Sequence, residues 1–358
     1  MECFEKLTWS NIKIEPPKES VRKKIQANWD AVAKPIDGMG RFESLTATIG
    51  TILEDEQISV EKKAIIIMCA DNGIVEEGIS QSGQEVTRAV AENMGKGMSS
   101  VGRMAKQAGA DTIPIDIGIH TDTPIPGVLD RKVRKGTRNF RKEPAMTMEE
   151  MFQAIRTGIE IVAECKEAGY RLLGTGEMGI GNTTTSSAVA AALLSCEVEE
   201  VTGRGAGLTD EKLVHKIQVI REAIEMHDLH HASALQILQT VGGLDLAGLT
   251  GVCIGGALYK IPIVLDGVIS MVAALLAERI APGTKAYLIP SHLGKEPAVH
   301  RLTEELGIEP VIDGRMALGE GTGAAMMFAL LDLALVIYHE SASFTEIQVE
   351  QYERYEQA

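Results

Sequence analysis

The chain has 358 residues, of which 45% are apolar and 24% are charged, a composition typical of a globular protein with a large core. Its net charge of −15 argues against a nucleic-acid-binding protein, because such proteins neutralise phosphates with lysine and arginine. The five cysteines are scattered without a Cys-x-x-Cys pair and the polar start lacks signal-peptide character, so we expect reduced thiols in a cytoplasmic protein.

Six short apolar runs end abruptly in glycine, proline or a polar residue. In chain order they cover residues 64–70, 112–118, 170–173, 261–265, 285–289 and, more weakly, 310–312. Their near-continuous apolar character is typical of strands that are covered on both faces of a parallel sheet. Stretches with helical periodicity lie between them. The alternation of strands and helices therefore predicts an α/β fold with a mostly parallel sheet flanked by helices.

Capping patterns mark two of the long helices. Thr147, with Glu150 three positions later, forms a capping box and predicts a helix over residues 148–168. Thr209, followed by two acidic residues, predicts the start of another long helix, and this helix carries Lys216.

The two ends of the chain have no clear strands and have helical character. We expect residues 1–35 and 315–358 to pack together as a small helical domain, and residues 36–314 to form the large α/β domain. The longest apolar stretch, residues 321–338, is interrupted by Asp332, and an ionisable group is costly in the middle of a bilayer. We therefore predict a buried helix there rather than a membrane span.

Polar residues follow most of the predicted strands. In open parallel sheets, ligands bind beyond the carboxyl ends of the strands, so these residues are the first candidates for a site. They are Asp71, Asn72 and Gly73, Asp116, the loop 174–182, Asp266 with Gly267, and Ser291 with His292.

Residues 174–187, GTGEMGIGNTTTSS, match two phosphate-binding patterns. The glycine spacing fits a dinucleotide site, but Glu177 would then face a doubly charged pyrophosphate. A P-loop is not supported, because Asn182 stands where its lysine should be. A glycine-rich turn that opens a helix can still bind one phosphate through backbone N–H groups and the helix dipole. We favour such a single-phosphate site, and a structural turn without a ligand remains the alternative.

Two further segments could bring positive charge to an anion. Residues 131–142 contain seven basic residues, which form either a solvated loop or a loop shaped around an anion. Residues 201–208 are a second glycine-rich turn before a helix, and its Arg204, together with Lys216, could face a phosphate.

Glu320 lies between glycines at the start of a strongly apolar helix. It is either a carboxylate that interacts favourably with the helix dipole or a general base at the mouth of a buried pocket. Both interpretations stay open on chemistry alone. The histidines at 227, 230 and 231 lack a carboxylate or cysteine at ligand spacing, which indicates a surface cluster rather than a metal site.

Nine segments, taken together and in order, resemble one known family. They are KPIDGMGRFESL (34–45), IMCADNGIVEEGIS (67–80), IDIGI (115–119), GTRNF with PAMT (136–147), GEMGIGNTT (176–184), VGGLDLAGLTG (241–251), VLDG (264–267), YLIPSH (287–292) and LGEGTGAA (318–325). The chain is similar over most of its length to the nicotinate-nucleotide–dimethylbenzimidazole phosphoribosyltransferases, which activate the lower ligand of cobalamin.

The resemblance implies a Rossmann-like sheet with a small helical domain built from both termini. It also implies that phosphoribose moves from nicotinate mononucleotide to a nitrogen of a benzimidazole, with inversion, giving an α-ribazole phosphate and nicotinate. No pyrophosphate leaves in this reaction, so the resemblance implies neither a metal ion nor a cofactor.

The family's functional positions can be carried over residue by residue. Glu320 matches the general base of the family. The phosphate and ribose contacts match Gly176, Glu177, Met178, Gly179, Asn182, Gly203, Gly205 and Lys216, and the acceptor pocket matches Asn72, Ser82, Val90 and Leu318.

Two of these positions depart from the family pattern. Asn72 stands where the family commonly has histidine, and Val90 aligns with a glutamine near the acceptor in better-known members. Both changes lie on the acceptor side, so we expect an intact donor site with an altered acceptor, either another benzimidazole, a purine or a phenol. Two alternatives stay open, namely a weakly active or structural subunit paired with an active paralogue, and a nicotinamide-dinucleotide (NAD) oxidoreductase.

The resemblance also bears on partners. The family forms dimers, so we expect a homodimer or a heterodimer with a paralogue, small-molecule substrates, and no nucleic-acid or membrane partner.

Overall fold

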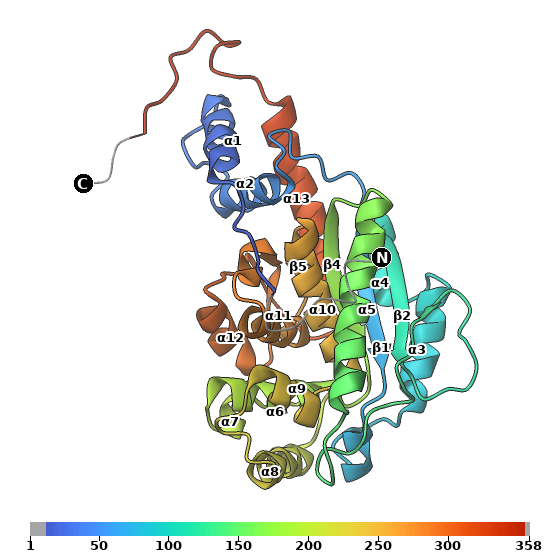
Figure 1. Cartoon of the computed structure of the whole chain (residues 1–358). Coiled ribbons are helices and arrows are strands. Elements are labelled where there is room, and N and C mark those ends of the chain that lie inside the picture. The colour runs from blue at the N-terminus through green and yellow to red at the C-terminus, as the bar shows by residue number, and fades with distance from the viewer. Residues whose placement is uncertain (1–11, 355–358) are drawn as a thin grey trace.

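A six-stranded sheet forms the centre of the protein, and the computed structural model describes residues 12–354 (Figure 1). The strand order is β3-β2-β1-β4-β5-β6, and every neighbouring pair is parallel. The strands are β1 (Lys63–Ala70), β2 (Asp111–Gly118), β3 (Leu129–Asp130), β4 (Leu172–Met178), β5 (Ile263–Leu265) and β6 (Leu288–Pro290). The predicted mostly parallel α/β sheet is confirmed.

The helices are more numerous than the strands. In the amino-terminal half they are α1 (Glu19–Ala31), α2 (Arg41–Leu53), the 3-10 helix η2 (Gly73–Glu77), α3 (Glu85–Gly95), α4 (Ser100–Gln107) and α5 (Met148–Glu167). Beyond β4 they are α6 (Asn182–Leu194), α7 (Val198–Val201), α8 (Asp210–Met226), α9 (Ala234–Val241), α10 (Leu244–Tyr259), α11 (Val268–Ile280), the 3-10 helix η3 (Thr284–Tyr287), α12 (Ala298–Leu306) and α13 (Thr322–Glu340).

Alternate residues of β1 face two different cores, as the two-residue period of a strand requires. Ile66 and Met68 pack in the core that contains α5, α6, α10 and α11. Ile65 and Ile67 pack in the core that contains α1 to α4 and α13. All eight residues of β1 are buried, so helices cover both faces of the sheet and leave its carboxyl edge as the place for a site.

Strand β4 is longer than the sequence predicted. The apolar run ended at Leu173, but β4 continues to Met178 and includes Gly174 and Gly176. These glycines lie where the turn before α13 approaches the strand, and a Cβ at Gly176 would collide with the carbonyl oxygen of Glu320. The hydrophobic pattern therefore ended early because close backbone packing replaces side-chain burial at these positions.

The weakest predicted strand does not belong to the central sheet. Ile312 begins β8 (Ile312–Met316), which pairs with β7 (His292–Gly294) in a separate two-stranded sheet. The predicted strand at 285–289 is also shortened, because residues 284–287 form η3. Both predicted capping helices are present. Thr147 accepts the Glu150 N–H at 3.1 Å and donates its own N–H to Glu150 Oε2 at 2.7 Å, and Thr209 Oγ1 accepts the Lys212 N–H at 3.4 Å.

Helices from the two ends of the chain lie at one end of the molecule. α1 and α2 pack together and α2 contacts α13, although these elements are far apart in sequence (Figure 1). The predicted division placed α2 with the large domain, and that division stays a prediction; the first 11 residues lie outside the described ones. α13 is the one described helix long and apolar enough to cross a membrane, and 50% of its apolar window is buried within the protein. Its Met327, Phe328 and Leu331 belong to the core, as expected for the buried helix.

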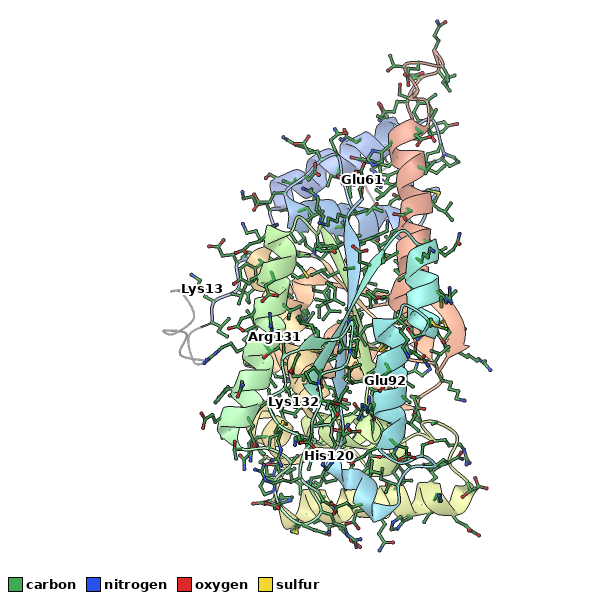
Figure 2. The ribbon with its side chains drawn as sticks, turned by 90° about the vertical axis from the view of Figure 1, so that its right-hand side faces the viewer. Lys13, Glu61, Glu92, His120, Arg131 and Lys132 are labelled. Atoms are coloured by element: carbon green, nitrogen blue, oxygen red, sulfur yellow. The ribbon has the colours of Figure 1, made fainter. Side chains whose placement is uncertain are left out.

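The basic run at 131–142 is neutralised by the protein's own carboxylates. Arg131 and Lys132, labelled in Figure 2, pair with Glu164 and Asp116 at 3.0 Å each. The other five basic residues pair with Glu150 (Arg134 and Arg138), Asp122 (Lys135), Glu77 and Glu222 (Arg141) and Glu76 (Lys142). The ion pairs favour the solvated loop, but Arg131 and Lys132 line an open hollow beside α5, so the anion-binding alternative stays a prediction.

Candidate active site

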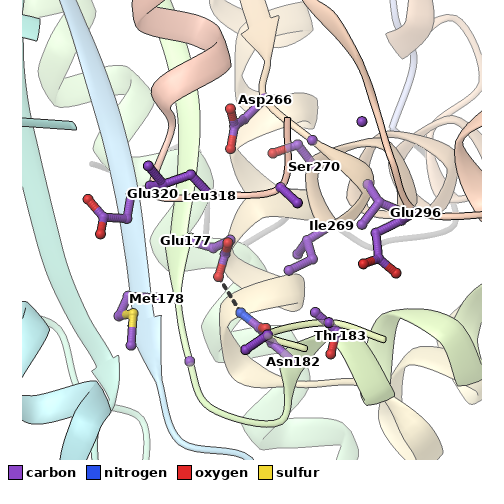
Figure 3. Close-up of a pocket in the computed structure, with 18 of the residues that line it drawn as sticks. Glu177, Met178, Asn182, Thr183, Asp266, Ile269, Ser270, Glu296, Leu318 and Glu320 are labelled. Atoms are coloured by element: carbon purple, nitrogen blue, oxygen red, sulfur yellow. Dashed lines mark hydrogen bonds between the residues drawn. The ribbon is translucent and has the colours of Figure 1, made fainter. Parts of the chain in front are cut away.

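A cavity of about 310 Å³ opens at the carboxyl ends of β4 and β5 (Figure 3). Eight residues that the sequence assigned to a site line it: Val90, Glu177, Met178, Gly179, Asn182, Gly205, Leu318 and Glu320. They come from α3, the end of β4, the start of α6, the 201–208 turn and the loop before α13. Folding thus brings together segments that are more than 200 residues apart in sequence.

The other predicted residues do not line this cavity. Gly176 lies behind Glu320 in β4, and Gly203 and Lys216 lie next to lining residues. Asn72 is fully buried beneath the 179–181 turn, beside Asp245. Ser82 is exposed in the loop between η2 and α3, where its N–H donates to Ser80 Oγ at 3.3 Å. The acceptor-pocket role of Asn72 and Ser82 therefore stays a prediction without a direct position on the cavity wall.

The glycine-rich turn places the start of α6 at the cavity. Gly181, with φ of 94°, is the N-cap of α6, and no side chain caps this end of the helix. Asn182 and Thr183 of the first turn line the cavity, and the first turn has no acidic residue. The positive end of the helix dipole is therefore free to interact with an anion in the cavity.

Lys216 adds a buried positive charge beside this helix end. Its side chain is 1% exposed, and Nζ donates to Thr183 Oγ1 and to the Gly203 carbonyl oxygen, both at 3.1 Å. Both acceptors are neutral, and burial lowers the pKa of Lys216 to about 8. A buried ammonium group without a bonded carboxylate is well suited to a phosphate ligand, which would supply the missing negative charge.

Arg204, the other predicted cation, does not line this cavity. Its guanidinium group pairs with Asp210 and donates to the Leu208 carbonyl oxygen at 2.9 Å. It lines a second, smaller hollow together with Asn182 and Thr183 at the start of α6.

Glu177 is partly buried in the cavity wall, where Asn182 Nδ2 donates to its Oε2 (Figure 3). Burial, and then the nearby charge of Asp245, raise the pKa of Glu177 to about 8. Burial likewise raises the pKa of Asp245 to about 6. Glu177 consequently keeps its proton at neutral pH, and in that form it can donate a hydrogen bond to a ligand hydroxyl or phosphate oxygen.

Glu320 lines the cavity from a strained loop, and in Figure 3 its carboxylate points away from Glu177 and Asn182. Gly319, Glu320 and Gly321 have consecutive positive φ angles of 81°, 62° and 99°. This conformation costs a residue with a side chain about 1–3 kcal/mol. Glu320 Oε2 accepts the N–H of Val101 at 3.1 Å in the first turn of α4, so its carboxylate interacts with the start of that helix rather than with α13.

Several lining residues were not assigned to the site from sequence. Asp266 and His292 follow strands and were candidates on position alone, whereas Glu296, which packs against Gly203, carried no sequence signal.

Of the clustered histidines, His227 Nε2 lies 2.8 Å from the Phe140 carbonyl oxygen. Within residues 12–354, no group of three or more His, Cys, Asp or Glu side chains is arranged to hold a metal ion.

Comparison with known proteins identifies close relatives. A family model described as "Phosphoribosyltransferase" matches residues 14–349. The chain is 44% identical over 330 residues to a nicotinate-nucleotide–dimethylbenzimidazole phosphoribosyltransferase of Ruminiclostridium cellulolyticum, covering 92% of this chain and 94% of the relative. It is 45% identical over 329 residues to the protein of that name from Acetivibrio thermocellus, with the same two coverages. The crystal structure of CobT from Thermus thermophilus superposes with a TM-score of 0.87 at 35% identity, covering 93% of this chain and 100% of that one.

Proposed function

The chain belongs to this phosphoribosyltransferase family, and we propose on that premise that it transfers phosphoribose from nicotinate mononucleotide to an aromatic base. The products are nicotinate and an α-ribazole-type phosphate for the lower ligand of a cobamide. The match of most of this chain to the family does not favour the two alternatives, an NAD oxidoreductase and a weakly active or structural subunit.

One observation carries the proposal, namely that Glu320 and the start of α6 line a single cavity and that Lys216 bonds to Thr183 directly behind its wall. The donor phosphate would bind in the cavity at the first turn of α6, beside the hydrogen bond from Lys216 to Thr183, so that the helix dipole and the buried cation act on it from the same side. Glu177 and Asn182 lie next to this position and would bond the ribose. These residues suit one phosphate rather than a pyrophosphate.

The acidic character of the cavity suits the chemistry at the anomeric carbon. Glu296 and Glu320 line it, together with Glu177, which keeps its proton, and Asp266, whose carboxylate caps α13. The nicotinate ring nitrogen is cationic in the donor and neutral once it leaves, and the sugar carbon becomes positive in the transition state. Nearby carboxylates stabilise that developing charge when they are held in place before the reaction.

We propose Glu320 as the general base. In the proposed step a ring nitrogen of the acceptor bonds to the anomeric carbon on the face opposite nicotinate. The old carbon–nitrogen bond breaks, and its electron pair returns to the pyridine ring. Glu320 takes the proton released from the acceptor N–H, so the ribazole product is neutral at its ring. The step requires no further reactant, and we propose that it uses neither a metal ion nor a cofactor.

The acceptor would lie against the apolar part of the wall. Val90, Met178, Ile269 and Leu318 line the cavity, and Val90 has no group that can hydrogen-bond to a ring substituent. We infer that the site accepts more than dimethylbenzimidazole, including a phenol whose hydroxyl Glu320 would deprotonate. Competition between dimethylbenzimidazole and p-cresol tests this, and exclusive use of dimethylbenzimidazole would exclude it.

The test of the function itself is an assay of nicotinate release. The purified chain is incubated with nicotinate mononucleotide and a panel of benzimidazoles, purines and phenols. We expect nicotinate and a new ribosylated base in equal amounts. Absence of turnover with every acceptor, while NADH binds tightly, would instead support the oxidoreductase.

An exposed apolar stripe on α13 supports self-association. Met326, Leu333 and Val336 lie on one face of this helix and are 38%, 65% and 46% exposed. We propose a homodimer formed through this face, with pairing to a paralogue as the alternative.

The described cysteines are free and three of the four are buried, which agrees with a cytoplasmic location.

A further inference from the structure

Asp266 caps a helix that begins more than 50 residues later in the sequence. It follows β5, is 2% exposed, and uses both carboxylate oxygens. Oδ2 accepts the Gly321 N–H at 3.1 Å and Oδ1 accepts the Gly323 N–H at 2.7 Å. The N-cap residue of α13 provides no side-chain cap of its own, so Asp266 satisfies these backbone donors in its place.

These two bonds hold the backbone at the carboxyl end of the strained Glu320 loop. Residues 319–321 all have positive φ, and such a conformation persists only where the surroundings fix it. The Asp266 bonds hold the backbone directly after Glu320 and again two residues later. They therefore determine the direction in which the Glu320 side chain leaves the loop, toward the Val101 N–H.

Thr175 fixes the backbone of Asp266, and the ring of His292 lies near its carboxylate. Thr175 Oγ1 accepts the Asp266 N–H at 3.1 Å. His292 is 3% exposed, and its ring packs closely against Gly323, where a Cβ would collide with the ring and lie 2.8 Å from Asp266 Oδ1. Burial raises the pKa of Asp266, and the neighbouring His292 is the largest effect opposing it.

We propose that Asp266, supported by His292, is a positioning residue that holds Glu320 in its reactive orientation. The inference rests on the proposed function of Glu320 as the base. It assigns to the VLDG and YLIPSH segments a role other than contact with substrate.

The test uses Asp266→Asn, which keeps the shape of the side chain but replaces one acceptor oxygen with an N–H₂ donor. One of the two loop amides then loses its partner. We expect kcat to fall about 10- to 100-fold, because a shift of about 1 Å in a catalytic group has effects of this size. KM for nicotinate mononucleotide should change less than threefold, since the phosphate site is untouched.

Asp116→Asn is the matched control. Asp116 is also 2% exposed and also accepts a backbone N–H, that of Ile119, but it does not line the cavity. We expect it to lower the thermal midpoint without a selective loss of kcat. Equal kcat in the two variants would overturn the proposal.

A double variant separates positioning from a general structural effect. With Asp266→Asn and Glu320→Gln combined, we expect a rate within about threefold of Glu320→Gln alone, because the positioned group is already absent. A double variant whose rate is lowered by the product of the two single-variant losses would overturn the proposal. If Asp266→Asn does not fold, Thr175→Val, which removes the acceptor of the Asp266 N–H, should show the same loss of kcat at a smaller scale.

Hydrogen exchange provides a readout that does not depend on activity. In Asp266→Asn at least one of the Gly321 and Gly323 amides should exchange at least 10-fold faster, whereas the amides of β4 stay protected. Unchanged exchange at both glycines would contradict the positioning role even in an active enzyme. If exchange is faster in Asp266→Asn but the wild-type protein releases no nicotinate, the capping role of Asp266 stands and only the proposed function is contradicted.

Discussion

Lys216 Nζ donates a hydrogen bond to Thr183 Oγ1 at 3.1 Å, which joins a buried cation on α8 to the first turn of α6. The two elements bring different sources of positive charge to one place, an ammonium group and a helix dipole. Most other parts of the cavity wall that carry charge are acidic. A bound phosphate therefore has one favourable location, and the ribose and nicotinate ring must extend from there toward Glu320.

Replacing Lys216 with methionine should weaken donor binding. Methionine fills a similar volume but removes the charge, and a hydrogen bond to a charged group contributes about 1.5–3 kcal/mol. We expect KM for nicotinate mononucleotide to rise about 10- to 100-fold with a smaller change in kcat. Lys212→Met, on the exposed side of the same helix, is the control. Equal KM values for the two variants would exclude a phosphate contact by Lys216.

Glu320→Gln should remove most of the activity. Glutamine keeps an oxygen that can accept the Val101 N–H, so the loop is disturbed little, but it cannot take a proton. We expect kcat to fall about 10²- to 10⁴-fold, the usual contribution of a general base. Calorimetry should show binding of nicotinate mononucleotide within about threefold of wild type. Glu340→Gln, at the other end of α13, is the control, and normal turnover by Glu320→Gln would refute the assignment.

Glu177 should make both stability and donor binding depend on pH. Its folded-state pKa of about 8 lies above the ordinary value of 4.5, so the folded protein binds more protons than the unfolded chain between those values. The folded state consequently loses stability as pH rises through that window. Glu177→Gln should raise the thermal midpoint more at about pH 8 than at about pH 5, because the destabilising effect of Glu177 grows as pH rises between its unfolded and folded pKa values.

The same ionisation should weaken binding of the donor phosphate above pH 8, roughly where Glu177 becomes charged. Lys216, whose pKa is also lowered to about 8, loses its charge in the same range. Titration of KM in wild type and in Glu177→Gln separates them, because only the contribution of Lys216 remains in the variant. Identical pH dependences of KM in both proteins would show that Glu177 does not affect the phosphate.

The sequence predicted the sheet well because buried parallel strands have a strong hydrophobic signal. It failed where backbone contact replaces that signal, as in β4, whose glycines were assigned to a loop because they have no side chain to bury. The site residues were likewise predictable only where the residue type itself gave a signal. Glu320 and Lys216 stood out by residue type; Glu320 lines the cavity and Lys216 bonds to its lining residue Thr183, and their roles stay predictions.

Asp266 and Glu296 could not be assigned roles from sequence for a physical reason. The role of Asp266 depends on two backbone amides more than 50 residues away, which no local pattern encodes. Glu296 lies at the cavity only because β7 pairs with β8, a pairing that the single predicted strand at 310–312 did not include. Ser82 illustrates the opposite case, in which a matched position lies outside the cavity wall in this structure.

Leu333 tests the proposed homodimer. It is 65% exposed at the centre of the apolar stripe on α13, so a charge there would be buried without a partner when two copies associate. We expect sedimentation to show a dimer for wild type and a monomer for Leu333→Glu at micromolar concentration. Val214→Glu is the matched control, because Val214 is also 65% exposed but lies on α8. A wild-type monomer would exclude the homodimer and leave pairing with a paralogue, whereas dissociation by Val214→Glu alone would move the interface to α8.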